Sequence, residues 1–164
     1  MRTQDEQPAF RVSSAQARYG DSDPQIAYLR VHFALMRISR THMPPIESLL
    51  RAHGIADPIW YEILLAAEEA GERGVQMLDL QRRLFVPQYA VSRHIARMQK
   101  AGLVHRKAAS GKGRGQTIFV TDAARGLQDR VWKAYSDKVR AALAPKLDTQ
   151  EAYALLDVLN RLYP

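Results

Sequence analysis

The sequence of 164 residues contains no cysteine. Without a thiol, the chain has no thiolate zinc site, no cysteine nucleophile and no sensor based on thiol oxidation. Long hydrophobic runs are also missing, since no stretch approaches the ~18 apolar residues of a membrane helix and the opening MRTQDEQPAF has no signal-type apolar core. We therefore expect a cytoplasmic globular protein, long enough to bury a core without disulfides or a structural metal.

Acidic residues are missing from one quarter of the chain, the stretch from Leu80 to Thr121. Nine basic residues lie in that stretch, whereas the rest of the sequence has 15 basic and 17 acidic residues, so the net charge of +7 comes from this one region. A continuous basic stretch is typical of a protein that binds a polyphosphate such as nucleic acid. Charge alone leaves a basic, solvated face without a partner as the alternative.

Helical periodicity precedes the basic stretch. Residues 1–22 are polar and have no period, which predicts a flexible arm. Asp23 and Pro24 form a helix start signal, and apolar residues follow at spacings of three and four. We expect this helix to stop at Pro44 and Pro45, with a separate short helix after them.

A second Asp-Pro pair, Asp57 and Pro58, predicts the start of the next helix. Gly71 and Gly74 should end it. Near its end lies a charged cluster of ordinary surface type, with Glu68, Glu69, Glu72 and Arg73.

Within the basic stretch the pattern predicts two helices joined by a tight turn. Pro87 opens the second helix, on which Val91, Ile95 and Met98 share one inward face and leave the polar and basic side chains outside. Gly102 follows as a left-handed cap. This arrangement is typical of a helix-turn-helix, whose second helix enters the major groove of DNA.

Two short strands should follow, at residues 103–107 and 117–120, with the glycine-rich and basic SGKGRGQ between them. The predicted fold is therefore mainly α with a small β wing, a winged helix-turn-helix with about six helices. We expect four side chains to read bases in the major groove: Gln88, Tyr89, Ser92 and Arg93. Four others should contact phosphates: Arg82, Arg83, Arg97 and Lys100. Lys112 and Arg114 of the wing should meet the minor groove or its rim.

The run LFVPQYAVSRHIARMQKAGLV, residues 84–104, resembles the recognition helix and following strand of the MarR family of bacterial transcription regulators. The resemblance covers residues 24–163 and implies dimers formed through the first and last helices. It divides the chain into a flexible arm at 1–22, dimerisation helices at 23–56 and 122–164, and a DNA-binding lobe at 57–121. The family's wing carries an Asp-x-Arg pair, of which Arg114 matches the Arg, whereas Lys112 replaces the Asp. Pro87 replaces the family's common Ser.

The resemblance also suggests a small aromatic or phenolic ligand between the dimer helices and the DNA-binding lobe. Candidate lining residues are His32, Trp60, Tyr61 and Tyr135. A plain core or surface role is the alternative for each of them.

Catalytic and metal-binding patterns are missing from the sequence. His32, His42 and His53 are ten and eleven residues apart, unlike the closely spaced ligands of a metal site. We therefore expect no cofactor, no metal and no enzyme. Two functions stay open: a homodimeric, ligand-responsive transcription repressor that binds a pseudo-palindromic operator in double-stranded DNA, or a winged-helix protein-interaction module without sequence-specific DNA binding.

Overall fold

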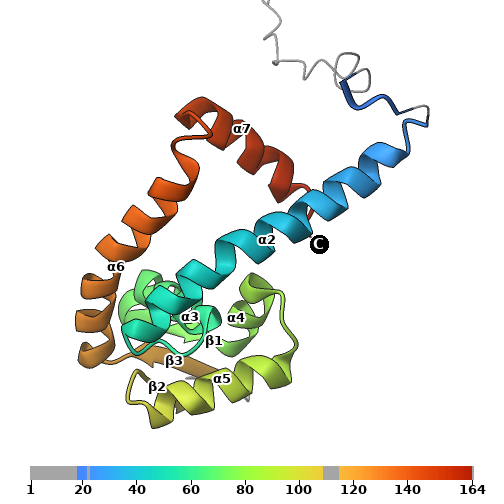
Figure 1. Ribbon diagram of the computed structural model, residues 1–164. Helices are drawn as coiled ribbons and strands as arrows, with labels where there is room; N and C mark the ends of the chain where they lie inside the picture. The colour runs from blue at the N-terminus through green and yellow to red at the C-terminus, as the bar shows by residue number, and fades with distance from the viewer. Residues whose placement is uncertain (1–17, 22, 109–114, 164) are drawn as a thin grey trace, which may run out of the picture. The chain divides into compact units, whose positions relative to one another are not determined.

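The computed structural model describes residues 18–21, 23–108 and 115–163. Six α-helices and one small sheet form in these residues, which confirms the predicted fold class (Figure 1). In chain order they are α2 (Ile26–Ala52), α3 (Pro58–Ala70), the 3-10 turn η1 (Gly71–Arg73), β1 (Val75–Gln76), α4 (Met77–Leu84), α5 (Gln88–Lys100), β2 (Val104–Ala108), β3 (Gln116–Val120), α6 (Asp122–Leu143) and α7 (Thr149–Asn160). The chain forms two compact units that divide between His42 and Met43, inside α2.

The expectation that a helix ends at Pro44 and Pro45 is wrong, because both prolines lie inside α2. A proline has a φ angle that suits a helix, and it disturbs the helix only by lacking an N–H and by crowding the carbonyl four residues earlier. Two such losses interrupt the hydrogen-bond ladder here without ending the helix. The predicted short helix is the last part of α2, and Gly54, at φ +83°, ends it.

Helix α3 is the centre of the second unit. The Asp57 side chain caps it by accepting a hydrogen bond from the Ile59 backbone N at 2.9 Å, and Pro58 occupies the first turn, as predicted. Gly71, at φ +56°, ends it. Its buried side chains point in several directions around the axis: Trp60, Tyr61, Ile63, Leu64, Ala66 and Ala67. A helix buried on so many sides is enclosed by neighbours.

The sheet has the strand order β1-β3-β2, and both pairings are antiparallel. The two predicted strands form β2 and β3, whereas the two-residue strand β1 was not predicted. Gly74 precedes β1 at φ +65°, where a Cβ atom would lie 2.6 Å from the Thr117 Cγ2 atom and 2.7 Å from the ring of Phe119. Only glycine fits this approach without displacing β3.

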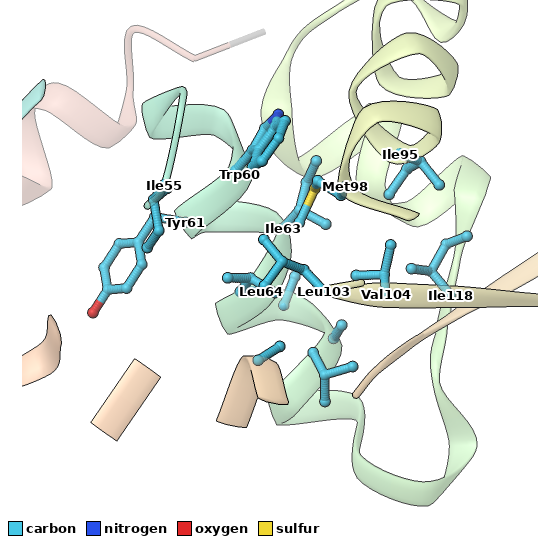
Figure 2. Packing of buried hydrophobic residues seen from close by; sticks show 14 of the residues in the cluster. Ile55, Trp60, Tyr61, Ile63, Leu64, Ile95, Met98, Leu103, Val104 and Ile118 are labelled. Atoms are coloured by element: carbon cyan, nitrogen blue, oxygen red, sulfur yellow. The ribbon is translucent and has the colours of Figure 1, made fainter. Parts of the chain in front are cut away.

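Helix α5 packs on this centre through its predicted apolar face. Met98 of α5 lies beside Ile63 of α3 in the core, and Ile95 lies on the side toward the sheet (Figure 2). Val104 and Ile118 of the sheet belong to the same core cluster, so α5 is fixed to both α3 and the sheet. This packing holds the opposite face of α5 toward solvent.

Candidate nucleic-acid interface

The turn between α4 and α5 is tight. Phe85 ends α4 in the left-handed region, at φ +51°, and Pro87 caps the start of α5 with an extended backbone. The prediction that Pro87 opens the second helix is confirmed. At the other end of α5, the backbone amides of Gly102 and Leu103 donate to the carbonyls of Gln99 and Met98, both at 3.0 Å, which is a Schellman cap.

Helix α5 has one buried and one exposed face. The buried face holds Val91, Ile95 and Met98, as predicted, together with His94. The exposed face carries the predicted base readers Gln88, Tyr89 and Arg93, with Ser92 half-buried beside them, and continues to Arg97 and Lys100. Tyr89 is 74% exposed, so its ring contributes nothing to the core. The structure therefore brings these residues together on one solvent-facing surface, which we call the α5 face.

Arg106 connects this surface to the sheet. It was not among the site residues predicted from the sequence. From β2, its guanidinium donates to the backbone carbonyl of Ser92 at 3.4 Å and to the Gln116 Oε1 atom at 3.3 Å. One side chain thus joins α5, β2 and the start of β3. The pairing of a strand residue with a helix carbonyl 14 positions earlier has no signal in the sequence.

Two of the predicted phosphate contacts have partners within the protein. Arg83 donates two hydrogen bonds to the carboxylate of Glu69, at 2.5 and 3.1 Å. This pairing lowers the pKa of Glu69 and raises that of Arg83. The Arg97 guanidinium lies 5.5 Å from the centre of the Trp60 ring, at cation–π distance. Both arginines are exposed, so their charge still faces solvent.

Arg82 and Lys100 are exposed as well, and no ion pair involving them is found within the described residues. The predicted wing contacts, Lys112 and Arg114, lie outside the described residues. Nearby on β2, the Lys107 ammonium lies 4.9 Å from the ring centre of Phe119.

His94 is a buried polar residue that the sequence reasoning missed. Its Nδ1 atom has no hydrogen-bond partner within the described chain and lies 4.0 Å from the Asp57 Oδ2 atom. Its position three residues after Val91 and four before Met98 is the signal that could have assigned it to the inner face. His94 and Asp57 bring the middle of α5 close to the N-terminus of α3.

Two of the four candidate ligand residues are in contact with each other. Tyr61 and Tyr135 pack together with their ring centres 4.7 Å apart. Trp60 is buried on a different side of α3, beneath Arg97. His32 belongs to the first unit and lies exposed next to Phe33.

Both ends of the chain expose large apolar side chains. On the part of α2 in the first unit these include Tyr28, Leu29, Val31, Phe33, Leu35, Met36 and Ile38. On α7 and just beyond it they are Tyr153, Leu155, Leu156, Val158, Leu162 and Tyr163. Exposed large apolar side chains gathered on one element in this number are typical of a protein–protein interface.

None of the helices in the described ranges is long and apolar enough to cross a membrane. Within the same ranges, no three histidine, cysteine or acidic side chains are grouped as metal ligands would be.

Comparison with known proteins identifies relatives of this segment. The model of the MarR family matches residues 53–115, a span that contains α3, α4, α5 and β2. The HTH-type transcriptional regulator TtmR of Methylorubrum extorquens (strain PA1) is 26% identical over 118 residues, which are 72% of this chain and 59% of TtmR. The chain thus spans less than two thirds of that relative.

Solved structures, MarR family regulators among them, have the same fold. Sco3205 from Streptomyces coelicolor, solved in complex with DNA, aligns with a TM-score of 0.72 at 20% identity, over 87% of this chain and 91% of that one. CouR from Rhodococcus jostii RHA1, solved with p-coumaroyl-CoA bound, aligns with a TM-score of 0.71 at 20% identity, over 81% and 91%. The resemblance inferred from residues 84–104 is confirmed by these matches.

Proposed function

We propose, on the premise that residues 53–115 carry a MarR family winged helix-turn-helix, that the protein is a transcription regulator that binds specific sites in double-stranded DNA. The observation that carries this proposal is the α5 face. Its side chains can form directional hydrogen bonds, they are exposed together, and the helix beneath them is fixed to the core. Sco3205, of the same fold, was solved in complex with DNA, which supports the proposal.

Within this proposal the side chains of the α5 face have different tasks. Arg93 can donate two parallel hydrogen bonds to guanine, and Gln88 can pair in the same way with adenine. Tyr89 and Ser92 contact base edges or thymine methyl groups beside them. Arg97, Lys100, Arg82 and Arg83 contact phosphates, which position the helix without reading sequence. Lys112 and Arg114 extend the contact to the adjacent minor groove.

The regulator acts as a homodimer. Soluble monomers rarely expose as many large apolar side chains as α2 and α7 do here. In this proposal a second copy of the chain covers them. An open groove of about 580 Å³ lies between α6 and α7, and its apolar walls include Val139, Leu143 and Leu156. In the proposed dimer this groove adds to the apolar surface that the second copy can cover. A dimer presents two α5 helices, so its operator is a pseudo-palindrome.

Regulation is repression, relieved by a small aromatic effector. CouR, of the same fold, was solved with p-coumaroyl-CoA bound, which supports an effector here. Tyr61 and Tyr135, whose rings are in contact in the second unit, are the candidates that contact it.

The experiment that tests the DNA-binding proposal is selection from a pool of random duplexes with the full-length protein. We expect the bound sequences to converge on inverted half-sites about 10 base pairs apart from centre to centre, one turn of DNA. A pool that does not converge contradicts the proposal. It would favour the winged helix as a protein-interaction module, whose basic surface meets an acidic partner.

A further inference from the structure

A cavity of about 350 Å³ lies between α3 and α6 in the second unit. Its walls are formed by Tyr61, Leu65, Glu68, Gln128, Asp129 and Trp132. The volume lies within the range of small-molecule sites. None of these six wall residues is basic, although the chain as a whole is.

Two deeply buried polar atoms in the wall have no hydrogen-bond partner among the described residues, Tyr61 Oη and Gln128 Oε1. Tyr61 is 2% exposed and Gln128 is 3% exposed. The Gln128 Nε2 atom donates to the Glu68 Oε2 atom at 2.6 Å, so Oε1 is the atom left over, and it can only accept. The phenol of Tyr61 points away from the labelled side chains of α5 (Figure 2). Buried polar atoms normally have partners, so this wall has hydrogen-bonding capacity that no described residue uses: the Gln128 Oε1 atom can only accept, whereas the Tyr61 hydroxyl can accept or donate.

Burial raises the pKa of Tyr61, and the neighbouring Tyr135 and Glu68 raise it further. The phenol therefore stays neutral at physiological pH. It adds no negative charge and can accept a hydrogen bond on its oxygen.

The charge of the cavity comes from two carboxylates at its rim, those of Glu68 and Asp129. The basic residues one turn before and one turn after Asp129 are Arg125 and Lys133. Each donates a hydrogen bond of 2.6 Å to another carboxylate, Arg125 to Asp122 and Lys133 to Asp137. Among the described residues, neither Glu68 nor Asp129 takes part in an ion pair, so the negative charge at the rim has no salt-bridge partner there.

We propose that this cavity binds a small organic cation, a protonated amine on an aromatic or aliphatic body. The two rim carboxylates attract the ammonium group, and the two buried oxygens accept its N–H hydrogen bonds. The exposed ring of Trp132 offers a cation–π face at the mouth, and Leu65 packs against the apolar body. An organic anion would meet two like charges there. The cavity shares Tyr61 with the effector contact proposed above, so the inference narrows the chemistry of that effector and rests on the proposed function in this respect; a binding test without DNA distinguishes its failure from that of DNA recognition.

The test uses three ligands with the same ring and different charge: phenethylammonium, the neutral 2-phenylethanol and the anionic phenylacetate. Each is titrated calorimetrically into the full-length protein without DNA, so the result is independent of any operator. We expect phenethylammonium to bind at least about tenfold more tightly than 2-phenylethanol, and phenylacetate to be the weakest. Equal binding of the cation and the alcohol, tighter binding of the anion, or no binding of the cation would each overturn the proposal.

A pair of double variants locates the site. Glu68→Gln with Asp129→Asn removes both rim charges and keeps an oxygen that can accept from Gln128, so the local structure is preserved. Glu72→Gln with Asp157→Asn removes two exposed carboxylates elsewhere. We expect the first pair to lose the preference for the cation and the second to keep it. Loss in both variants would mean that the cation responds only to overall charge, and loss in neither would place it elsewhere; either result contradicts the site.

Discussion

Single residues on the α5 face differ in what their removal should do to DNA binding. Arg93→Ala should weaken binding by about 1 to 3 kcal/mol and relax the preference at one base position, because a bidentate donor is removed. Competition binding against operators changed at single positions measures this. Unchanged relative affinities for selected and random duplexes would show that Arg93 does not read a base.

Lys100→Ala is the matched control on the same helix. Removal of a phosphate-binding ammonium group should weaken every duplex alike, and the dependence of log affinity on log salt should become shallower by about one unit for each phosphate that the variant no longer neutralises. A change in sequence preference would contradict the positioning role of Lys100.

The Arg83–Glu69 pair predicts a substitution that tightens DNA binding instead of weakening it. The two hydrogen bonds from Arg83 hold the pKa of Glu69 below its ordinary value, so the pair persists at neutral pH and breaks only as the pH falls through that lowered pKa. Glu69→Gln should release the Arg83 charge and tighten binding to random and selected duplexes by similar factors. Glu72→Gln changes the charge equally and is the control. If the two variants bind DNA alike, Arg83 does not contact phosphate.

Substitution of Gly74 tests how closely the turn before β1 packs against β3. Gly74→Ala should destabilise the protein by about 2 to 4 kcal/mol, because the positive φ angle and the contacts with Thr117 and Phe119 both penalise a Cβ atom. Gly54→Ala has a positive φ angle but open space around its Cβ position, so it should cost only about 1 kcal/mol. Urea denaturation compares the two, and equal losses of stability would show that the packing against β3 is unimportant.

At the level of elements, local signals predicted most of the structure. Caps and periodicity located α3, α5 and the strands β2 and β3, because each depends on residues only a few positions apart. The expected break at Pro44 and Pro45 was wrong because proline reduces helix stability without fixing where a helix ends. The strand β1 has two residues and exists through pairing with β3, which no local pattern reports.

The same distinction applies to the candidate site. Periodicity along α5 predicted which side chains face solvent, and the structure agrees except at Ser92, which is half-buried. The contacts that hold these side chains come from residues far along the chain. Glu69 pairs with Arg83, the ring of Trp60 lies against Arg97, and Arg106 of β2 donates to the Ser92 carbonyl. Pairings of this kind depend on the tertiary fold, so no local sequence pattern could indicate them.

Arg106 is a link between elements that a single substitution can test. Arg106→Met keeps an unbranched apolar stem and removes the guanidinium group, with its hydrogen bonds to the Ser92 carbonyl and Gln116. The orientation of α5 should become less fixed, so the ratio of specific to random affinity should fall while the salt dependence stays nearly unchanged. A weaker salt dependence with unchanged specificity would make Arg106 a phosphate-binding residue instead.

For the whole molecule, the apolar surfaces at the ends of the chain predict the assembly. Leu155→Asp with Val158→Asp places charges on exposed apolar positions of α7 and should convert a dimer to a monomer in sedimentation at micromolar concentration. Operator affinity should fall in parallel, because two α5 helices act together on one site. Asn160→Asp adds charge at an exposed polar position and should leave the dimer intact. A monomeric wild-type protein, or a dimeric double variant, contradicts this interface.

Sequence reading through α5 can be measured directly on the whole protein. The measurement is the ratio of its affinities for the selected operator and for a random duplex of equal length, at one stated salt concentration. We expect a ratio of about 10³ or more, as specific DNA-binding proteins have. A ratio near one would mean that the basic surface binds polyanions without reading sequence, and α5 would not be a base-reading helix.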